Sequence, residues 1–368
     1  MSHVNPPFRA DHVGSLLRPP EILEARRRRA AGEIYDAELR EVEDRAIAAM
    51  IPKLEATGIR SITDGEFRRE WFHLDFLQQL DGVTVSGMIA ASSDAGETVH
   101  QAPPKITVTG KLRHQHPIQV DDFRYLATHT SLTPKVSIPS PTMVHFRGGR
   151  GGIDIESYPD LDEFFEDLAQ CYRDEIGALY AAGCRYIQLD DTNLAYLCDP
   201  VMRQGAVERG DDPDELPRTY AALINAALDG RADDLTVGIH LCRGNFRSKH
   251  FASGGYEAVA EVLFNEIDVD AYFLEYDDER SGDFAPLRFF PKDKTLVLGL
   301  VTSKVAEIED KDLLKARVAE AAAYVDLDQM CLSPQCGFSS TIEGNEITEA
   351  DQWAKLRHVV EVADDIWA

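Results

Sequence analysis

Short runs with strand patterns, several of them nearly continuously apolar, alternate with longer helical patterns along this chain, and this alternation constrains the fold more than any other feature. The run Thr295–Leu300 is apolar almost throughout, which is typical of a strand buried on both faces of a parallel sheet. Eight runs are predicted to be strands: Asp11–Ser15, Gly58–Asp64, Lys135–Pro139, Arg185–Asp190, Leu235–His240, Asp270–Glu275, Thr295–Leu300 and Leu327–Ser333.

The segments between these runs carry helical patterns. The clearest are Asp36–Thr57, Asp160–Ala182, Leu216–Gly230, Tyr256–Asn265 and Asp310–Tyr324. Eight strands that alternate with helices favour an α/β fold, a (β/α)8 TIM barrel. A doubly wound open sheet is the alternative, but no glycine-rich dinucleotide fingerprint follows any strand.

One stretch, at about residues 83–133, interrupts the alternation. It contains Ser/Ala/Gly runs, the pair Pro103-Pro104 and the short strand pattern Lys105–Gly110. We interpret it as an inserted hairpin and loop region at one end of the barrel. The expected organisation is one catalytic TIM-barrel domain over residues 1–368 with this insertion.

Charge and hydropathy exclude some classes of function. Lys and Arg total 38 and Asp and Glu total 64, which gives a formal net charge of -26. Such a chain repels phosphate backbones, so we expect no nucleic-acid partner. No apolar run approaches the ~20 residues that span a bilayer, and Met1–Arg9 lacks the apolar core of a signal peptide. We expect a cytoplasmic protein with no membrane association.

The six cysteines are too few, in a chain of 368 residues, for a disulfide framework. Cys171, Cys184 and Cys198 lie in apolar surroundings, and Cys331 lies next to a predicted strand. We predict that these four pack in the core. Cys242 and Cys336 have a different environment, described next.

Polar residues follow the predicted strands, where a barrel carries its chemistry. His240 and Cys242 are two residues apart at a strand end, so both side chains point to the same side. Glu275 ends the next predicted strand and Cys336 follows the last one. A histidine, a carboxylate and two thiolates suit zinc. From spacing alone, a catalytic metal and a chance grouping stay equally open.

These residues carry a resemblance to a known family. His240-Leu-Cys242, Phe273-Leu-Glu275 and Ser333-Pro-Gln-Cys336-Gly337 resemble the zinc motifs of cobalamin-independent methionine synthase. The similarity is to the C-terminal catalytic half of that enzyme, and it covers Asp11 to about Asp364. It implies a zinc-dependent methyltransferase in which His240, Cys242, Glu275 and Cys336 hold Zn²⁺. Short, core-type members of the group include epoxyalkane:coenzyme M transferases.

The resemblance also assigns the substrate residues. His12-Val-Gly14-Ser15 is similar to the family's loop for the amino acid carboxylate. Glu66, in Asp64-Gly65-Glu66, and Asp190 match the two family acids that bind the amino group of homocysteine. An ammonium between two carboxylates makes charge-assisted hydrogen bonds. Gly14, Ser15, Glu66 and Asp190 are therefore the expected substrate-binding residues, and the two acids are also the expected catalytic residues.

The methyl-donor side departs from the family pattern. The segment after Pro139 lacks the tryptophan that stacks on the folate pterin in the long enzymes, and Val301–Lys304 replaces a family histidine. Met143, His145 and Lys304 are the candidates on this side. The donor is expected to be methylfolate or a methyl-corrinoid.

The leading hypothesis is therefore methyl transfer to a zinc-bound thiol, with homocysteine as the expected acceptor. The first alternative keeps the zinc thiolate but opens an epoxide with a sulfonated thiol, in which case Glu66 and Asp190 would have no amine to bind. Arg243 or Arg247 would be the candidate for binding a sulfonate. The second alternative is a zinc-stabilised accessory protein of a methyl-transfer system.

Overall fold

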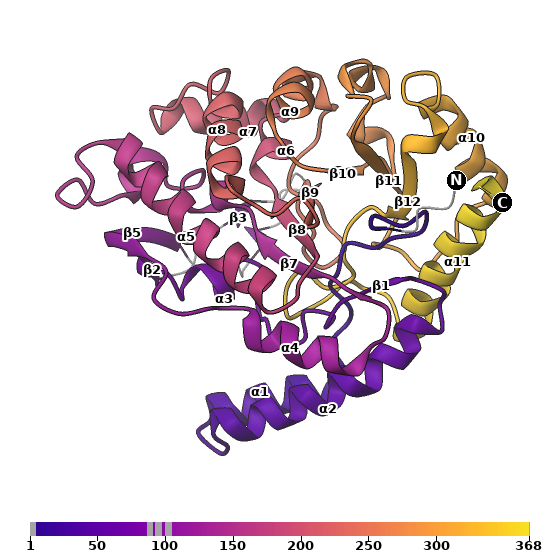
Figure 1. The fold of residues 1–368 in the computed structure, drawn as a ribbon, viewed down its shortest axis with the longest axis horizontal. Coiled ribbons are helices and arrows are strands. Elements are labelled where there is room, and N and C mark those ends of the chain that lie inside the picture. Colours follow the sequence, from indigo (N-terminus) through magenta and orange to yellow (C-terminus); the bar gives the residue numbers. More distant parts are fainter. Residues whose placement is uncertain (1–4, 87–90, 93–97, 100–104, 368) are drawn as a thin grey trace.

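A parallel sheet lies at the centre of the computed structural model, which describes residues 5–86, 91–92, 98–99 and 105–367 (Figure 1). Six strands pair side by side in the order β12-β11-β10-β9-β8-β7, and every pair is parallel. Their bounds are β7 Val136–Pro139, β8 Tyr186–Asp191, β9 Thr236–Leu241, β10 Ala271–Glu275, β11 Thr295–Val301 and β12 Met330–Pro334. The predicted α/β class is confirmed.

The two predicted N-terminal strands are shorter than expected. Only β1, Ser61–Ile62, forms a regular strand in the second of them, and it pairs in parallel with β6, Thr133–Pro134, just before β7. Asp11–Ser15 forms no regular strand, although the neighbouring Ala10 makes a parallel bridge to Leu332 in β12. The predicted lengths were wrong, and each predicted run contains a residue with positive φ, Gly14 (φ 144) and Gly58 (φ 93), where the backbone is not extended.

The N-terminal segment nevertheless occupies the position between β12 and β1. The Asp11 N–H donates to Leu332 O at 2.9 Å, and the Leu16 N–H donates to Gly65 O at 3.0 Å. Among the described residues, β12 and β1 are therefore linked through this irregular segment and not by regular strand pairing, so the TIM-barrel sheet is interrupted here.

Helices follow the strands and pack outside the sheet (Figure 1). The five predicted helices are found as α2 Asp36–Glu55, α5 Leu161–Ala181, α8 Leu216–Leu228, α9 Ala260–Glu266 and α10 Lys311–Ala321. A 3₁₀ turn, Tyr256–Ala258, takes the first residues predicted for α9. Further helices are α1 Pro20–Ala30, α3 Leu74–Leu77, α4 Val120–His129, α6 Asn193–Tyr196, α7 Pro200–Glu208 and α11 Glu349–Trp367.

The insertion contains the expected hairpin. Strands β2, Asp81–Ser86, and β5, Lys105–Arg113, pair antiparallel, and β3, Ala91–Ser92, pairs with β4, Thr98–Val99. Alternate residues of β5 are buried because the strand packs against α5. The pair Pro103-Pro104 and parts of the Ser/Ala/Gly runs lie outside the described residues.

The sequence predicts that no segment spans a bilayer and that four cysteines pack in the core. None of the helices within the described ranges combines the length and the hydropathy that crossing a bilayer requires. The cysteines predicted to fill the core, Cys171, Cys184, Cys198 and Cys331, are all buried.

A buried ion pair fixes the N-terminal segment to the strands. Asp11 Oδ1 accepts hydrogen bonds from Ser61 Oγ at 2.6 Å and from Lys135 Nζ at 3.3 Å, and Asp11 Oδ2 accepts one from Tyr186 Oη at 2.9 Å. The side chains of Asp11 and Lys135 are both fully buried. One carboxylate thus ties the irregular first segment to β1, to the segment before β7 and to β8.

We expect Lys135→Met to lower the free energy of unfolding by about 3–5 kcal/mol, because it leaves the buried Asp11 carboxylate without its cation. Urea titration followed by far-UV circular dichroism measures this. Lys53→Met is the matched control: it removes an exposed ion pair with Glu349, at 2.7 Å, and should cost less than about 1 kcal/mol. Equal losses for the two variants would contradict this account of the N-terminal segment.

Candidate functional site

Three of the four predicted metal ligands meet at the C-terminal ends of the strands. His240 lies near the end of β9, Cys242 directly follows β9, and Cys336 follows β12. One potential ligand atom from each lies within 4.8 Å of the other two, and the two Sγ atoms are 3.3 Å apart. All three side chains are buried. Their convergence requires the sheet, since β10 and β11 lie between β9 and β12.

The chemistry of this cluster fits a metal ion. Neither ring nitrogen of His240 has a hydrogen-bond partner among the described residues, although the ring is buried. The Cys242 thiol lowers the pKa of Cys336 well below its usual range, against the effect of burial, and the same contact raises the pKa of Cys242. Two sulfurs 3.3 Å apart and the buried imidazole beside them form a donor set that a divalent cation would satisfy.

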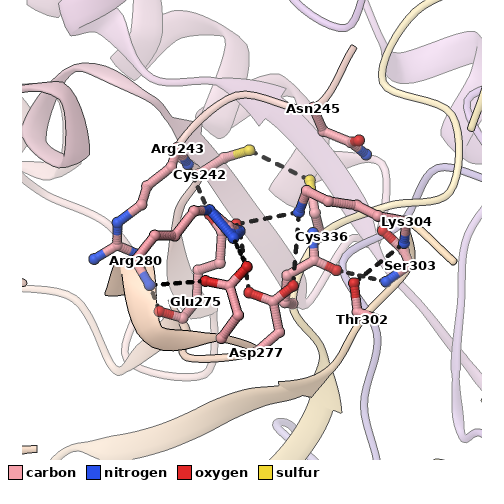
Figure 2. A network of polar contacts seen from close by, with 12 residues as sticks. Cys242, Arg243, Asn245, Glu275, Asp277, Arg280, Thr302, Ser303, Lys304 and Cys336 are labelled. Atoms are coloured by element: carbon pink, nitrogen blue, oxygen red, sulfur yellow. Dashed lines mark hydrogen bonds and ion pairs between the residues drawn. The ribbon is translucent and has the colours of Figure 1, made fainter. Parts of the chain in front are cut away.

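Glu275, the fourth predicted ligand, does not belong to this group of three. Its carboxylate accepts hydrogen bonds from the Arg243 N–H at 2.7 Å, from Lys304 Nζ at 3.3 Å and from Arg280 (Figure 2). Burial opposes its ionisation, but the Lys304 ammonium and the Arg280 guanidinium hold the pKa of Glu275 well below its usual range. The structure thus places Glu275 in an ion-pair network beside the cluster.

Three of the four predicted substrate residues line the cavity that the metal cluster also lines. Ser15, Glu66 and Asp190 border it together with His240, Cys242 and Cys336. Gly14 does not border the cavity. Its carbonyl accepts a hydrogen bond from Thr63 Oγ1 at 2.8 Å, and a Cβ at this position would lie 3.5 Å from Glu66 Oε1.

The two acids in the cavity have few partners among the described residues, and the cation nearest to Glu66 is Arg69, whose Nη1 lies 3.9 Å from Oε2. Glu66 Oε1 accepts a hydrogen bond from Ser137 Oγ at 3.1 Å, whereas Oε2 has no hydrogen-bond partner within the described residues. Asp190 Oδ1 accepts one from Gln188 Nε2 at 2.6 Å. Burial raises the pKa of both carboxyls, and that of Asp190, which Glu66 also raises, reaches about 7. A positively charged ligand group between them would relieve both effects.

The three candidates for the donor side do not line the cavity. Met143 is buried, and its sulfur accepts a hydrogen bond from Asn193 at 3.4 Å. His145 Nδ1 lies 3.0 Å from Tyr220 Oη in a buried aromatic cluster. Lys304 is buried in the Glu275 network.

Sequence reasoning missed an aromatic wall of the same cavity. The wall is formed by Trp71, Phe72, Tyr196, Phe246 and Phe251. The rings of Trp71 and Phe246 are nearly parallel, at 8°, with centroids 6.4 Å apart. The run Trp71-Phe-His73, a few residues after Glu66, was a signal that could have revealed this wall.

Two polar side chains accompany these rings. His73 and Arg147 both border the cavity, and His73 is only 2% exposed. Neither ring nitrogen of His73 has a hydrogen-bond partner in the described part of the chain. Burial and the nearby Arg147 hold the pKa of His73 well below its usual value, so the ring is neutral at pH 7. A neutral imidazole can both donate and accept a hydrogen bond with a second ligand.

Comparison with known proteins identifies the family. The model of the cobalamin-independent synthase catalytic domain matches residues 8–365. YxjH, an uncharacterized protein of Bacillus subtilis (strain 168), is 48% identical over 363 residues, which are 98% of this chain and 95% of the relative. A methionine synthase of Pyrococcus abyssi (strain GE5 / Orsay) is 26% identical over 327 residues, or 88% of this chain and 84% of the relative.

A solved structure agrees with these sequence comparisons. The putative vitamin-B12 independent methionine synthase from Listeria monocytogenes has a TM-score of 0.79 and 41% sequence identity, and the match covers 98% of both chains. The family model, the relatives and the solved structure therefore agree on one family. The chain belongs to the cobalamin-independent methionine synthase family and corresponds to its catalytic domain.

Proposed function

We propose that this protein transfers a methyl group to the sulfur of a small thiol, with homocysteine as the acceptor and methionine as the product. One observation carries the proposal: the His240, Cys242 and Cys336 cluster and the two acids Glu66 and Asp190 line the same cavity. A thiol at the cluster and an ammonium at the acids are the two ends of an amino-acid thiol. Membership of the family supports the same reaction class.

We assign Zn²⁺ as the metal. One imidazole nitrogen and two thiolates from three protein side chains match the donor sets of catalytic zinc sites. When bound, zinc would lower the pKa of a coordinated thiol so that the sulfur is a thiolate, the nucleophilic form, at neutral pH.

The protein groups around the cavity would orient the amino acid. Glu66 and Asp190 would accept hydrogen bonds from its ammonium. The Ser15 hydroxyl accepts from the Ser339 N–H at 3.3 Å, which leaves the hydroxyl hydrogen to donate to a carboxylate. Holding the acceptor in one orientation would supply much of the rate acceleration, since it removes the entropy of bringing two substrates together.

The aromatic wall would receive the methyl donor. Flat rings stack on aromatic side chains, and Trp71 and Phe246 offer two nearly parallel faces. Of the two donors considered, methylfolate fits this wall better than a methyl-corrinoid, because its pterin is a single flat ring system. His73 and Arg147 are nearby polar side chains that have hydrogen-bonding capacity to offer.

Epoxide opening by a sulfonated thiol is less well supported. That thiol has no amino group, so it would leave two buried acids of raised pKa without an ammonium to bind. Arg243, one candidate for a sulfonate, is fully buried, and its guanidinium donates to Gly254 O and to Glu275 O instead.

The direct test is methionine formation by the zinc-loaded protein from homocysteine and each methyl donor. Methylfolate should support turnover. Absence of methionine with methylfolate, with a methyl-corrinoid and with other small donors would reject the proposed reaction.

The role of the two acids predicts a change in substrate preference. Glu66→Gln and Asp190→Asn should each weaken homocysteine binding by about tenfold to a hundredfold, the value of one charge-assisted hydrogen bond. They should have little effect on the binding of a thiol analogue of homocysteine that lacks the amino group. Isothermal titration calorimetry measures the binding of both thiols. Asp122→Asn is the control, because this mostly buried acid pairs with Arg40 at 2.6 Å and does not border the cavity. An equal loss of affinity for both thiols would show that the acids do not bind the amino group.

Metal removal distinguishes a catalytic metal ion from one that stabilises the fold. We expect a chelator to abolish homocysteine binding while the far-UV circular dichroism spectrum stays unchanged, since the sheet and its apolar core do not depend on the ion. Added Zn²⁺ should restore binding. Unfolding on chelation would instead favour a zinc-stabilised accessory protein.

A further inference from the structure

Glu66 is held in a backbone conformation that a residue with a side chain rarely adopts. It lies in residues 64–69, which we call the Glu66 loop, and its φ is 57°. The Glu66 N–H donates to Asp64 Oδ1 at 2.8 Å, and the Glu66 carbonyl accepts from the Arg69 N–H at 3.0 Å. A strained conformation of this kind persists only where surrounding contacts fix it.

The side chain of Arg18 supplies contacts of this kind from outside the loop. It is buried, and its Nη2 donates to Glu66 O at 2.9 Å and to Arg69 O at 3.1 Å. Its Nη1 donates to Ser339 O, which belongs to residues 336–340, the Cys336 loop. One guanidinium thus bridges the Glu66 loop and the Cys336 loop, because its planar fork of N–H groups can reach several carbonyls at once.

The segment just before Arg18 contacts the same two loops. The Leu16 N–H donates to Gly65 O at 3.0 Å, and the Phe338 N–H donates to Ser15 O at 2.9 Å. Arg18 itself does not border the cavity, although each of the three segments that meet here contributes a residue to its lining. The Arg18 bridge therefore lies behind the cavity and cannot touch a ligand in it.

The bridge is made by a charged donor. Burial lowers the pKa of Arg18 to about 10, so the guanidinium is still charged at pH 7. Within the described ranges no carboxylate forms an ion pair with it, and backbone carbonyls accept its hydrogen bonds. Hydrogen bonds from an ionised donor are stronger than those between neutral groups. Replacing Arg18 with an apolar residue should therefore loosen the contact between the two loops.

The sheet positions some residues of the site, and the loops position the others. Asp190 of β8 and His240 of β9 lie opposite each other in the register of neighbouring strands, so strand pairing fixes their separation. Glu66 and Cys336 lie on loops, where no strand pairing holds them. Their separation depends on contacts between the loops, and Arg18 bonds to both.

We propose that Arg18 is a positioning residue that fixes the separation between Glu66 and Cys336 and thereby selects the length of the amino-acid thiol. The inference rests on the proposed function, in which the acids bind the ammonium and the metal cluster binds the sulfur. Homocysteine has one methylene more than cysteine. If both ends of the substrate are held at a fixed separation, the shorter thiol cannot reach both, and one methylene is then worth about tenfold or more in affinity.

The ratio of the Kd for cysteine to the Kd for homocysteine tests this role. In isothermal titration calorimetry of the zinc-loaded protein, the wild-type ratio should be about ten or more, and Arg18→Met should reduce it to about three or less. Arg26→Met is the matched control. Arg26 is also buried and donates to Phe67 O at 2.8 Å and to Arg69 O at 2.9 Å, but its hydrogen bonds do not reach the Cys336 loop.

The control variant should keep the wild-type ratio even though it loses stability, so a purely structural role is distinguishable. Three results would overturn the proposal: a wild-type protein without preference for homocysteine, a folded Arg18→Met protein with the wild-type ratio, or an equal fall in Arg26→Met. If Arg18→Met does not fold, Arg18→Lys takes its place with the same expected fall, because an ammonium keeps the charge but lacks the planar fork.

Hydrogen exchange tests the bridge in the absence of any ligand. Arg18→Met should speed amide exchange about tenfold in both the Glu66 loop and the Cys336 loop, whereas Arg26→Met should do so in the Glu66 loop alone. Mass spectrometry of peptides from the two loops measures this. Unchanged exchange of the Cys336 loop in Arg18→Met would show that the bridge does not hold that loop, and the proposal would be wrong.

These readouts separate the role of Arg18 from the proposed reaction, since none of them needs a methyl donor. If the ratio falls as expected but no donor yields methionine, the proposed reaction fails and the role of Arg18 stands. If methionine forms while Arg18→Met keeps the wild-type ratio, the reverse holds. Absence of homocysteine binding to the wild-type protein would reject both.

Discussion

Parallel pairing between β9, β10, β11 and β12 determines where the functional side chains lie. The register sets His240 of β9 opposite Phe273 of β10, and Glu275 of β10 opposite Gly299 of β11. The C-terminal ends of all these strands therefore lie at the same edge of the sheet, where the metal cluster and the cavity form. Gly299 is required at this edge, because a Cβ there would lie 2.7 Å from Gln335 Cα and 2.8 Å from Leu274 O. The loop that carries Cys336 can approach β10 only over a residue without a side chain.

Electrostatic balance divides the site into two parts. On one side, Glu275 and Asp277 are compensated by Arg280 and Lys304, so this network is complete without a ligand. On the other side, Glu66 and Asp190 are buried with raised pKa values. The cations near these two acids compensate them only in part, since Arg69 Nη1 lies 3.9 Å from Glu66 Oε2 and the pKa values stay raised. The same pairing of opposite charges, between Asp11 and Lys135, holds the irregular N-terminal segment that carries Ser15.

The sequence was sufficient for the strand order and for the strand-end side chains because both follow from local patterns. Apolar runs such as Thr295–Leu300 predict strands, and residues two apart in a strand share a face, which brought His240 and Cys242 together in the prediction. Cys336 was found by its position after the last predicted strand, and motif resemblance assigned the two acids to the substrate.

Long-range partners were not predictable in the same way. Nothing local to Glu275 indicates that Lys304 lies 3.3 Å away, since the two meet only through the pairing of β10 and β11. The aromatic wall combines Trp71 with Phe246, which are far apart in the sequence, so no single pattern contains it. The strand at Asp11–Ser15 was overpredicted because the sequence alone does not show that the backbone at Gly14 has a positive φ.

The central claim is that the cluster of His240, Cys242 and Cys336 binds zinc and presents a coordination position to a thiol. X-ray absorption spectroscopy at the zinc edge tests it most directly, with the zinc-loaded protein measured before and after homocysteine is added. The account predicts two sulfur ligands in the free protein and three in the complex. Two sulfur ligands in both samples, despite bound homocysteine, would contradict it.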